Sequence, residues 1–257
     1  MGEHDGFLLE GRHLDKSFGK PPRQVLFDVS VGVRPGECLA IIGGSGSGKS
    51  TLTRILFGLE RADGGEVRFR GGSIATKDGA AALRRQSGVV YQNPFASLDP
   101  RWTVRRSVAE PLRLHGRKLD GAAVEWQVRQ ALGLVSLDPD IFLDRYPMDL
   151  SGGQAQRVAI ARAVITSPSV LLADEAMSAI DVAARLQILD AFAAIRERTP
   201  GMAMLMVSHD LGMVQHIADR ILVVHDGHVV EEGTARQVLD HPKQPYTRRL
   251  VEAATLD

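Results

Sequence analysis

Short apolar runs alternate along the chain with segments in which apolar residues recur every three or four positions. Three such runs end in small or polar residues and lead into a helical pattern: "ECLAIIGGSGSGKSTLTRILFGL", "SVLLADEAMSAIDVAARLQILDAFAAI" and "MAMLMVSHDLGMVQHIADRI". Buried strands that alternate with amphipathic helices are typical of a parallel sheet covered by helices. The pattern therefore predicts an α/β fold.

Two segments depart from this alternation. "RILVVHDGHVVEEG" reads as two short strands around an Asp-Gly turn, which predicts a hairpin near the end of the sheet. The middle of the chain, roughly Thr103 to Arg145, is helical in composition, with Gly116, Gly121 and Pro139 as breaks. We interpret it as an inserted helical subdomain. No internal repeat or low-complexity segment is apparent.

Composition narrows the functional classes. Lys+Arg and Asp+Glu each total 31 among 257 residues, so the formal net charge is zero, and aromatic residues make up 5%. Neither a basic field nor a base-stacking surface is indicated, which argues against nucleic-acid binding. The single cysteine, Cys38, fits a reducing compartment. No secretory signal pattern and no apolar run of ~20 residues is present, so we expect any membrane role to come through a partner.

The first chemical motif is "GGSGSGKST", which lies between the apolar run "CLAII" and the helical pattern "TLTRILFGL". Gly43, Gly48, Lys49 and Ser50 match the spacing of a phosphate-binding loop, whose amides wrap phosphates while Lys supplies charge and Ser a hydroxyl for Mg²⁺. A flexible glycine-rich turn is the alternative, but the flanking strand and helix favour the phosphate site. The predicted nucleotide contacts are Gly43, Gly44, Ser45, Gly46, Ser47, Gly48, Lys49, Ser50 and Thr51.

A second apolar run, "SVLLADE", ends in two carboxylates. Asp174 follows the strand as a Mg²⁺-holding carboxylate does, and Glu175 falls where a general base could polarise water. "MAMLMVSHD" places His209 after another strand. The carboxyl ends of parallel strands share one edge of a sheet, where ligands bind, so we expect these side chains to converge. Taken singly, they could also be surface carboxylates and a structural histidine.

The stretch "DLSGGQAQRVAIARA" predicts a helix with an unusual start. Ser151 and Gln154 fit the S-x-x-Q capping box, yet Gly152 and Gly153 are residues that cost a helix interior about 1 kcal/mol each relative to Ala. A helix start without Cβ atoms presents N–H groups and a positive dipole end, which suit an anion. No Lys stands beside it to hold a phosphate, so the source of that anion is open at this point.

The order of these motifs resembles the nucleotide-binding subunit of an ABC transporter over nearly the whole chain. "LSGGQ", residues 150–154, is similar to the signature motif that separates this family from other phosphate-loop ATPases. The resemblance implies that Gln92 in "VVYQNP" is the Q-loop glutamine, that "SAID" at 178–181 is the D-loop and includes Asp181, and that His209 is the switch histidine. It also places Phe18 in "KSFG" where an aromatic ring stacks on adenine.

For the fold, the resemblance implies a phosphate-loop ATPase core with a mostly parallel sheet, an amino-terminal antiparallel β subdomain and an inserted helical signature subdomain. We expect a single ABC ATPase domain over residues 1–257, with the helical subdomain at about 93–165 and an importer-type tail at about 240–257. The implied cofactors are ATP and Mg²⁺. The residues implied to contact Mg²⁺ are Ser50, Gln92 and Asp174, and those implied to act in catalysis are Lys49, Gln92, Glu175 and His209.

The family also implies an answer for the unusual helix. Two nucleotide-binding subunits pair head to tail, so that the signature helix of each points at the γ-phosphate of ATP held by the other. Ser151, Gly152, Gly153 and Gln154 would then complete the partner's site, where a Lys is already present.

Two further stretches are similar to the oligopeptide, dipeptide and nickel importer branch. They are "YQNPFASLDPRWTVRRSVAEPLRLHG", after the Q-loop, and "HPKQPYTRRLVEA", in which an insertion interrupts an HPYT-type motif. The resemblance implies an unlike ATPase partner, two membrane permease subunits, indirectly an extracytoplasmic solute-binding protein, and a peripheral location at the cytoplasmic face of the inner membrane. We expect residues around Phe95 to Trp102 to contact a permease helix.

Two other features bear on this prediction. Ala176 and Ile180 stand where relatives usually have Pro and Leu, but they keep a small or apolar character, so we expect activity to survive. His225 and His228 flank the hairpin turn without other suitably spaced ligands, so we expect no metal site there.

The cargo and the assembly stay open, because peptides, nickel or a related small solute all fit this branch. A soluble ABC ATPase of a C–P lyase-type phosphonate-degrading complex would share every nucleotide motif, and only its coupling surface or gene neighbours would distinguish it. DNA-repair ATPases need coiled-coil or zinc-bearing insertions, and translation-linked ABC proteins carry two ATPase units. A protein that merely binds nucleotide would not need Glu175 and His209.

Overall fold

The computed structural model describes residues 6–116, 119–177 and 180–255. Within them, one sheet has six strands in the order β10-β9-β3-β8-β7-β6, and another has four in the order β2-β1-β4-β5. The strands of the six-stranded sheet are β3 Cys38–Ile42, β6 Ser87–Val90, β7 Val170–Asp174, β8 Ala203–Val207, β9 Arg220–His225 and β10 His228–Thr234. The strands of the four-stranded sheet are β1 Leu9–Phe18, β2 Arg23–Val33, β4 Gly64–Phe69 and β5 Gly72–Ser73.

The six-stranded sheet lies at the centre of the molecule because its middle strands are apolar on both faces. Every residue of β3 and β8 is buried. Strands β9, β3, β8, β7 and β6 run parallel, while β10 pairs antiparallel with β9 at the edge and exposes part of its length. A strand buried on both faces reads as a continuous apolar run, which is why these strands were visible in the sequence. The mostly parallel sheet and the edge hairpin are confirmed.

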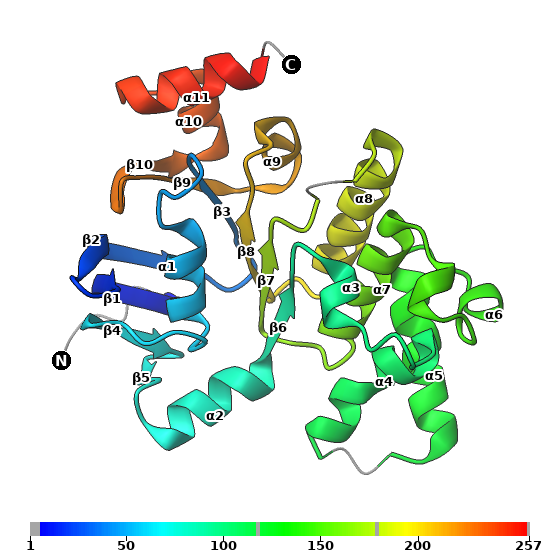
Figure 1. Cartoon of the computed structure of the whole chain (residues 1–257). Helices are drawn as coiled ribbons and strands as arrows, with labels where there is room; N and C mark the ends of the chain where they lie inside the picture. The colour runs from blue at the N-terminus through cyan, green and yellow to red at the C-terminus, as the bar shows by residue number, and fades with distance from the viewer. Residues whose placement is uncertain (1–5, 117–118, 178–179, 256–257) are drawn as a thin grey trace.

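Helices occupy the segments between the strands. Those between β6 and β7 are α3 Pro94–Ser97, α4 Val104–Leu114, α5 Gly121–Leu134, α6 Pro139–Phe142, the 3₁₀ turn η1 Pro147–Asp149 and α7 Gly152–Val164. The others are α1 Lys49–Leu56, α2 Lys77–Gln86, α8 Val182–Arg198, α9 Leu211–Ile217, α10 Ala235–Asp240 and α11 Pro245–Thr255. The antiparallel sheet and helices α3 to α7 lie on opposite flanks of the central sheet (Figure 1). The antiparallel amino-terminal subdomain and the helical insertion are therefore both present.

The helical insertion is organised around α7, which is buried along most of its length. Its apolar residues join one cluster with Val108 of α4, Val128 of α5 and Phe192 of α8. The side chains of Thr103 and Asp120 cap the first turns of α4 and α5. The predicted break at Gly116 lies between these helices, and Gly121 is the first residue of α5. Among the helices of the described residues, none combines the length and the apolar character that a membrane crossing requires.

Candidate nucleotide site

Three neighbouring strands of the central sheet end in register at one edge. Val207 of β8 pairs with Ile41 of β3 on one side and with Asp174 of β7 on the other. The chain beyond β3 is the predicted phosphate-binding loop, and His209 follows β8 by two residues. The register therefore brings the loop, the two carboxylates and the histidine to the same edge.

Gln92 follows β6, the strand next to β7 in the central sheet. β6 ends at Val90, which pairs with Ala173 of β7, and Gln92 is exposed just beyond it. The preceding residue is tied to the helical insertion, because the buried Gln156 of α7 donates from Nε2 to the Tyr91 carbonyl oxygen at 3.1 Å. A change in the position of α7 would thus be transmitted directly to the Gln92 segment.

The loop between β3 and α1 has a conformation that depends on glycine. Gly43 has φ 151° and Gly48 has φ 106°, and a Cβ atom on Gly43 would lie 2.1 Å from the Val224 carbonyl oxygen. The Lys49 ammonium donates to the carbonyl oxygens of Gly43 and Gly44 at 2.9 and 2.8 Å, and so lies across the loop. Ser47 Oγ is buried and has no hydrogen-bond partner within the described part of the chain. This is the form of a preformed anion cradle.

A hollow of about 240 Å³ opens at this loop, and Glu175 reaches it from β7. Its lining residues are Val25, Ser45, Gly46, Ser47, Gly48, Lys49, Ser50, Thr51 and Glu175. Of the predicted loop residues, those from 45 to 51 surround this space, whereas Gly43 and Gly44 do not line it. Residues 151–154 are not part of its lining either.

Burial and charge at the hollow favour a cation. Burial lowers the pKa of Lys49, although the charges of Glu175 and Asp174 act in the opposite direction. Burial and the charge of Glu175 raise the pKa of Asp174. Two adjacent carboxylates in a partly desolvated site are stabilised by added positive charge. Carboxylate and hydroxyl oxygens are the ligands that Mg²⁺ prefers, so Asp174 and Ser50 fit this ion.

Glu175 has a backbone conformation that side chains rarely adopt, with φ 49°. Its amide donates to the Val207 carbonyl oxygen at 3.0 Å, which fixes the turn after β7 against β8. A small hollow lies between Glu175, Arg185 and His209. Such strain recurs at functional sites, where the surrounding structure determines it.

The start of α7 has the predicted capping box. Ser151 Oγ accepts from the Gln154 amide at 3.3 Å, and Gln154 Oε1 accepts from the Ser151 amide at 2.9 Å. The two glycines differ, however. A Cβ atom on Gly152 would meet nothing within 4 Å, whereas one on Gly153 would lie 2.6 Å from the Ala184 Cβ atom. Gly152 leaves the helix start open, and Gly153 allows α7 to pack closely against α8.

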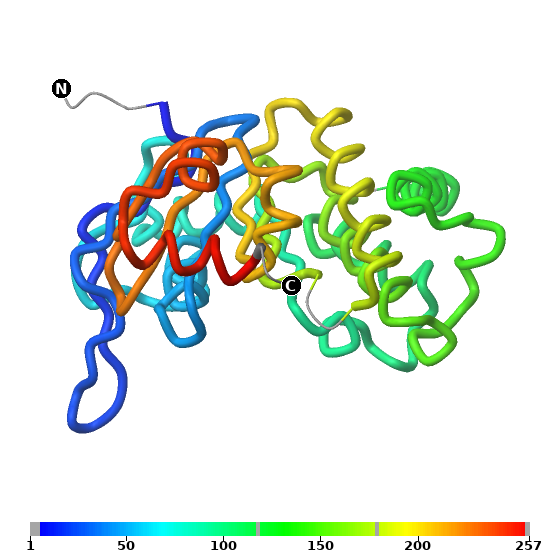
Figure 2. Tube along the Cα trace, turned by 90° about the horizontal axis from the view of Figure 1, so that it is seen from above, coloured from blue at the N-terminus to red at the C-terminus, as the bar shows by residue number. Residues whose placement is uncertain are grey.

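Two other predicted contacts lie outside the hollow. Phe18 ends β1 in the hairpin that extends from the body of the molecule (Figure 2), where it is 43% exposed and the Lys16 ammonium lies 4.9 Å from its ring centre. Asp181 caps α8 by accepting from the Ala184 amide at 2.9 Å. Residues 178–179 of the predicted D-loop lie outside the described residues. The adenine and D-loop roles stay predictions.

The segment after Gln92 presents one of its aromatic residues to solvent. Phe95 of α3 is 45% exposed, whereas Trp102 is half-buried and the Arg106 guanidinium stacks 4.1 Å from its ring centre. Phe95 is therefore the more accessible of the two predicted permease contacts.

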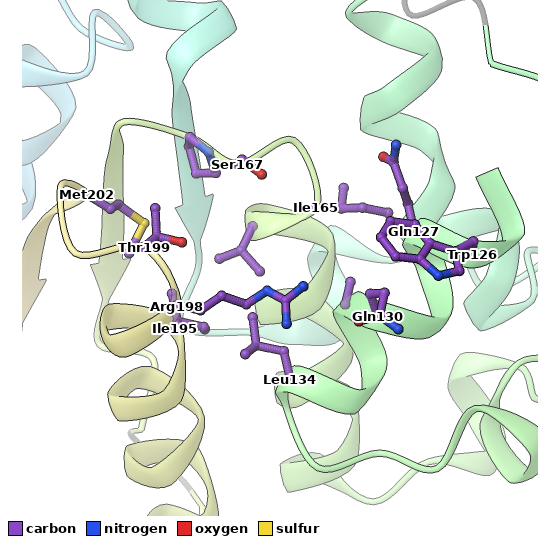
Figure 3. Close-up of a pocket in the computed structure, with 13 residues that line it drawn as sticks. Trp126, Gln127, Gln130, Leu134, Ile165, Ser167, Ile195, Arg198, Thr199 and Met202 are labelled. Atoms are coloured by element: carbon purple, nitrogen blue, oxygen red, sulfur yellow. The ribbon is translucent and has the colours of Figure 1, made fainter. Parts of the chain in front are cut away.

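A separate hollow of about 290 Å³ lies between α5, the loop after α7 and the end of α8 (Figure 3). Ser167 and Pro168 precede β7, and Met202 precedes β8, so this hollow lies at the amino edge of the central sheet. It is at the opposite edge from the phosphate-binding loop, and none of the predicted site residues lines it.

Three further residues connect the site to its surroundings, and the sequence did not single them out. Gln156 contacts the Gln92 segment, Arg185 pairs with Asp210 at 3.1 Å, and Tyr246 contacts the loop itself. Gln156 lies two residues beyond the signature motif, and Tyr246 lies within the tail motif. For these two residues, proximity to a motif was the signal in the sequence that could have pointed to a role. Their contacts could not be predicted, because they depend on the tertiary fold.

The fold and this edge of the sheet define a nucleotide-binding protein of the phosphate-loop class. Residues 26–178, more than half of the chain, match the family described as "ABC transporter". The chain therefore belongs to the ABC transporter family, as an ATP-binding cassette.

Within this family, the chain is similar to ATP-binding proteins of import and transport systems. The chain is 44% identical over 227 residues to the glutathione import ATP-binding protein GsiA of Escherichia coli K12, covering 88% of this chain and 36% of that protein. It is 39% identical to the oligopeptide transport ATP-binding protein OppF of Lactococcus lactis, covering 88% of this chain and 70% of OppF. The chain thus spans only about a third of GsiA.

Two solved structures share the architecture. A dimeric post-hydrolysis state of the cassette MJ0796, bound to ADP and Pi, has a TM-score of 0.80 at 30% identity, over 89% of this chain and 99% of that one. The protein cbiO1 from Clostridium perfringens, part of the ABC transporter complex cbiONQ, has a TM-score of 0.82 at 25% identity, over 98% and 99% of the two chains.

Proposed function

We propose that this chain is an ATP-hydrolysing subunit that powers a membrane importer of peptides or a related small solute. The observation that carries this proposal is the common edge of the sheet to which the strand register brings the loop of Lys49, the carboxylates Asp174 and Glu175, and His209. Glu175 also lines the hollow at the loop. The names of the relatives GsiA and OppF concern glutathione import and oligopeptide transport. Of the peptide and nickel cargoes that the sequence left open, they favour the peptide class, and they favour import over the phosphonate-degrading alternative.

Each residue of the edge has a distinct role in this proposal. The loop amides and the Lys49 ammonium bind the β- and γ-phosphates, and Asp174 and Ser50 hold Mg²⁺, which supplies positive charge against the phosphate oxygens. Glu175 accepts a proton from the attacking water, and His209 orients the γ-phosphate from the neighbouring strand. Gln92 reports the state of this region to the helical insertion through the contact between Tyr91 and Gln156.

The assembly follows from the signature helix. Ser151 and Gly152 lie at an exposed helix start with open space before it, and they do not line the hollow of their own chain. A helix start of this kind binds an anion supplied from elsewhere. We therefore infer a head-to-tail pair with a second ATPase subunit. From the resemblance to the importer branch, we propose that this second subunit has a different sequence, and that the pair docks on two permease subunits at the cytoplasmic face of the membrane and is served by an extracytoplasmic solute-binding protein.

Glu175→Gln tests the catalytic assignment, because it removes the proton acceptor at nearly constant shape. We expect nucleotide affinity to persist and ATP turnover to fall by at least about 100-fold, the lower range for loss of a general base. Turnover is measured with the ATPase partner present, and the trapped ATP-bound pair is detected by size-exclusion chromatography. Glu197→Gln, at an exposed position of α8, is the matched control. Wild-type turnover in Glu175→Gln would contradict the assignment, and unchanged nucleotide affinity in Lys49→Ala would contradict the binding site.

A further inference from the structure

The tail of the chain lies on the phosphate-binding loop. Val238 of α10 packs in one cluster with residues of β3 and β9, and α11 follows α10 in the chain. The Gly44 amide, in the loop, donates to the hydroxyl of Tyr246, in α11, at 2.7 Å. These two residues are 202 positions apart in the sequence. A contact of the loop with the tail is therefore built into the fold of a single chain.

The Tyr246 ring is fixed by a second contact. It stacks on the ring of His225 with centroids 3.7 Å apart and an interplanar angle of 16°. His225 ends β9, the strand that pairs with β3, and the carbonyl oxygen of the preceding Val224 fills the space beside Gly43. The hydroxyl is thus aimed at Gly44 by a ring that packs against the neighbouring strand.

Other contacts anchor the tail around Tyr246. The carboxylate of Glu231, in β10, accepts the amides of Lys243 and Gln244 at 2.8 and 3.0 Å, just before α11 begins. Leu250 of α11 packs in the cluster that contains Leu211 of α9, the helix that follows His209. Tyr246 therefore does not lie on a loose end, and the tail connects the loop to the helix beyond His209.

The loop is also held at its other end. The Gly227 amide, in the turn between β9 and β10, donates to the Ser47 carbonyl oxygen at 3.0 Å. Gly44 and Ser47 are thus both tied to the carboxy-terminal part of the chain. The Gly44 bond is the one of the two that depends on a side chain, so it is the one that a substitution can remove alone.

We propose that Tyr246 is a positioning residue of the nucleotide site, which fixes the start of the phosphate-binding loop through the Gly44 amide. A glycine-rich loop loses more backbone freedom than other segments when it is ordered around a ligand. Ordering it in advance lowers that cost and increases affinity. The proposal rests on the proposed function, because it takes ATP phosphates to bind at this loop.

Tyr246→Phe removes only the hydroxyl and keeps the ring that stacks on His225. We expect the Kd of a non-hydrolysable ATP analogue with Mg²⁺ and the KM for ATP to rise about three- to tenfold, the effect of one lost hydrogen bond, while kcat stays within twofold. In the nucleotide-free chain, the Gly44 amide should exchange hydrogen faster, as measured by NMR. Arg249→Ala, at an exposed position of the same helix, is the control and should change neither quantity.

The possible results separate this inference from the proposed function. An unchanged KM in Tyr246→Phe overturns the inference, and so does a lower melting temperature with unchanged KM, which would make Tyr246 purely structural. If the wild-type chain binds no nucleotide, the proposed function is wrong and the inference falls with it. If the wild-type chain binds nucleotide and Tyr246→Phe binds it equally well, only the inference is wrong.

Discussion

At the residue scale, Glu175 shows the difference between predicting a residue's type and predicting its backbone conformation. The motif "SVLLADE" predicted a carboxylate after a strand, and the residue is there. Its backbone is left-handed, and its amide donates to the carbonyl oxygen of Val207 in β8, a contact between segments more than thirty positions apart. Local spacing therefore identified the group, while the neighbouring strand determined its direction.

Cys38 illustrates burial at the same scale. It lies in β3 with no exposed surface, and burial raises the pKa of its thiol to about 12. Because the thiolate is the reactive form, we expect no labelling of the folded chain by a maleimide at pH 8 and complete labelling in guanidinium chloride. Mass spectrometry after a timed reaction measures both. Rapid labelling of the folded chain would show that β3 opens readily in solution and would contradict this expectation.

At the scale of elements, the two glycines at the start of α7 have different roles: one keeps the helix start open, and the other allows close packing against α8. The sequence predicts that both glycines of the signature clear the approach of an anion. Only Gly152 leaves open space, while Gly153 lies against Ala184 of α8. Helix packing thus explains one of the two residues without reference to any ligand.

This difference predicts opposite behaviour for two alanine variants. Gly153→Ala should destabilise the chain by about 1–3 kcal/mol, because its new methyl group overpacks the contact between α7 and α8. Gly152→Ala should keep or slightly raise the stability, because alanine favours the helix, but should lower the turnover of the ATP bound by the partner subunit. Denaturant unfolding measures the first quantity, and trapping of labelled nucleotide the second. Equal destabilisation by both variants would contradict the packing argument, and wild-type partner turnover in Gly152→Ala would contradict the head-to-tail pair.

At the scale of the whole molecule, the nucleotide edge and the exposed α3 are joined through β6 and α7. Gln92 follows β6, Gln156 ties the Tyr91 carbonyl to α7, and Phe95 lies three residues beyond Gln92. A segment fixed at one end by nucleotide and exposed at the other can transmit a change of state to a partner.

A crosslink tests where that partner docks. Ala96 of α3 is exposed and adjacent to Phe95, so Ala96→Cys paired with a cysteine on a cytoplasmic permease loop should crosslink in the assembled complex. Ala122→Cys, at an exposed position of α5, is the control and should not crosslink. Cys38 can stay in place because it is buried. An assembled complex that crosslinks through neither position, in any nucleotide state, would favour a soluble ATPase complex over an importer.

The sequence by itself determined strands β3, β7, β8, β9 and β10, the phosphate-binding loop and the residue types of the site. These depend on local rules: apolar runs mark buried strands, glycine spacing permits the loop, and a Ser and a Gln three positions apart cap a helix. Tertiary structure decided what depends on distant neighbours. It packed Gly153 against Ala184 of α8 and paired the Glu175 amide with a carbonyl oxygen of β8. It also brought the Tyr246 hydroxyl within hydrogen-bond distance of the Gly44 amide. No local pattern encodes such contacts, because each requires the packing of segments that are brought together only when the whole chain folds.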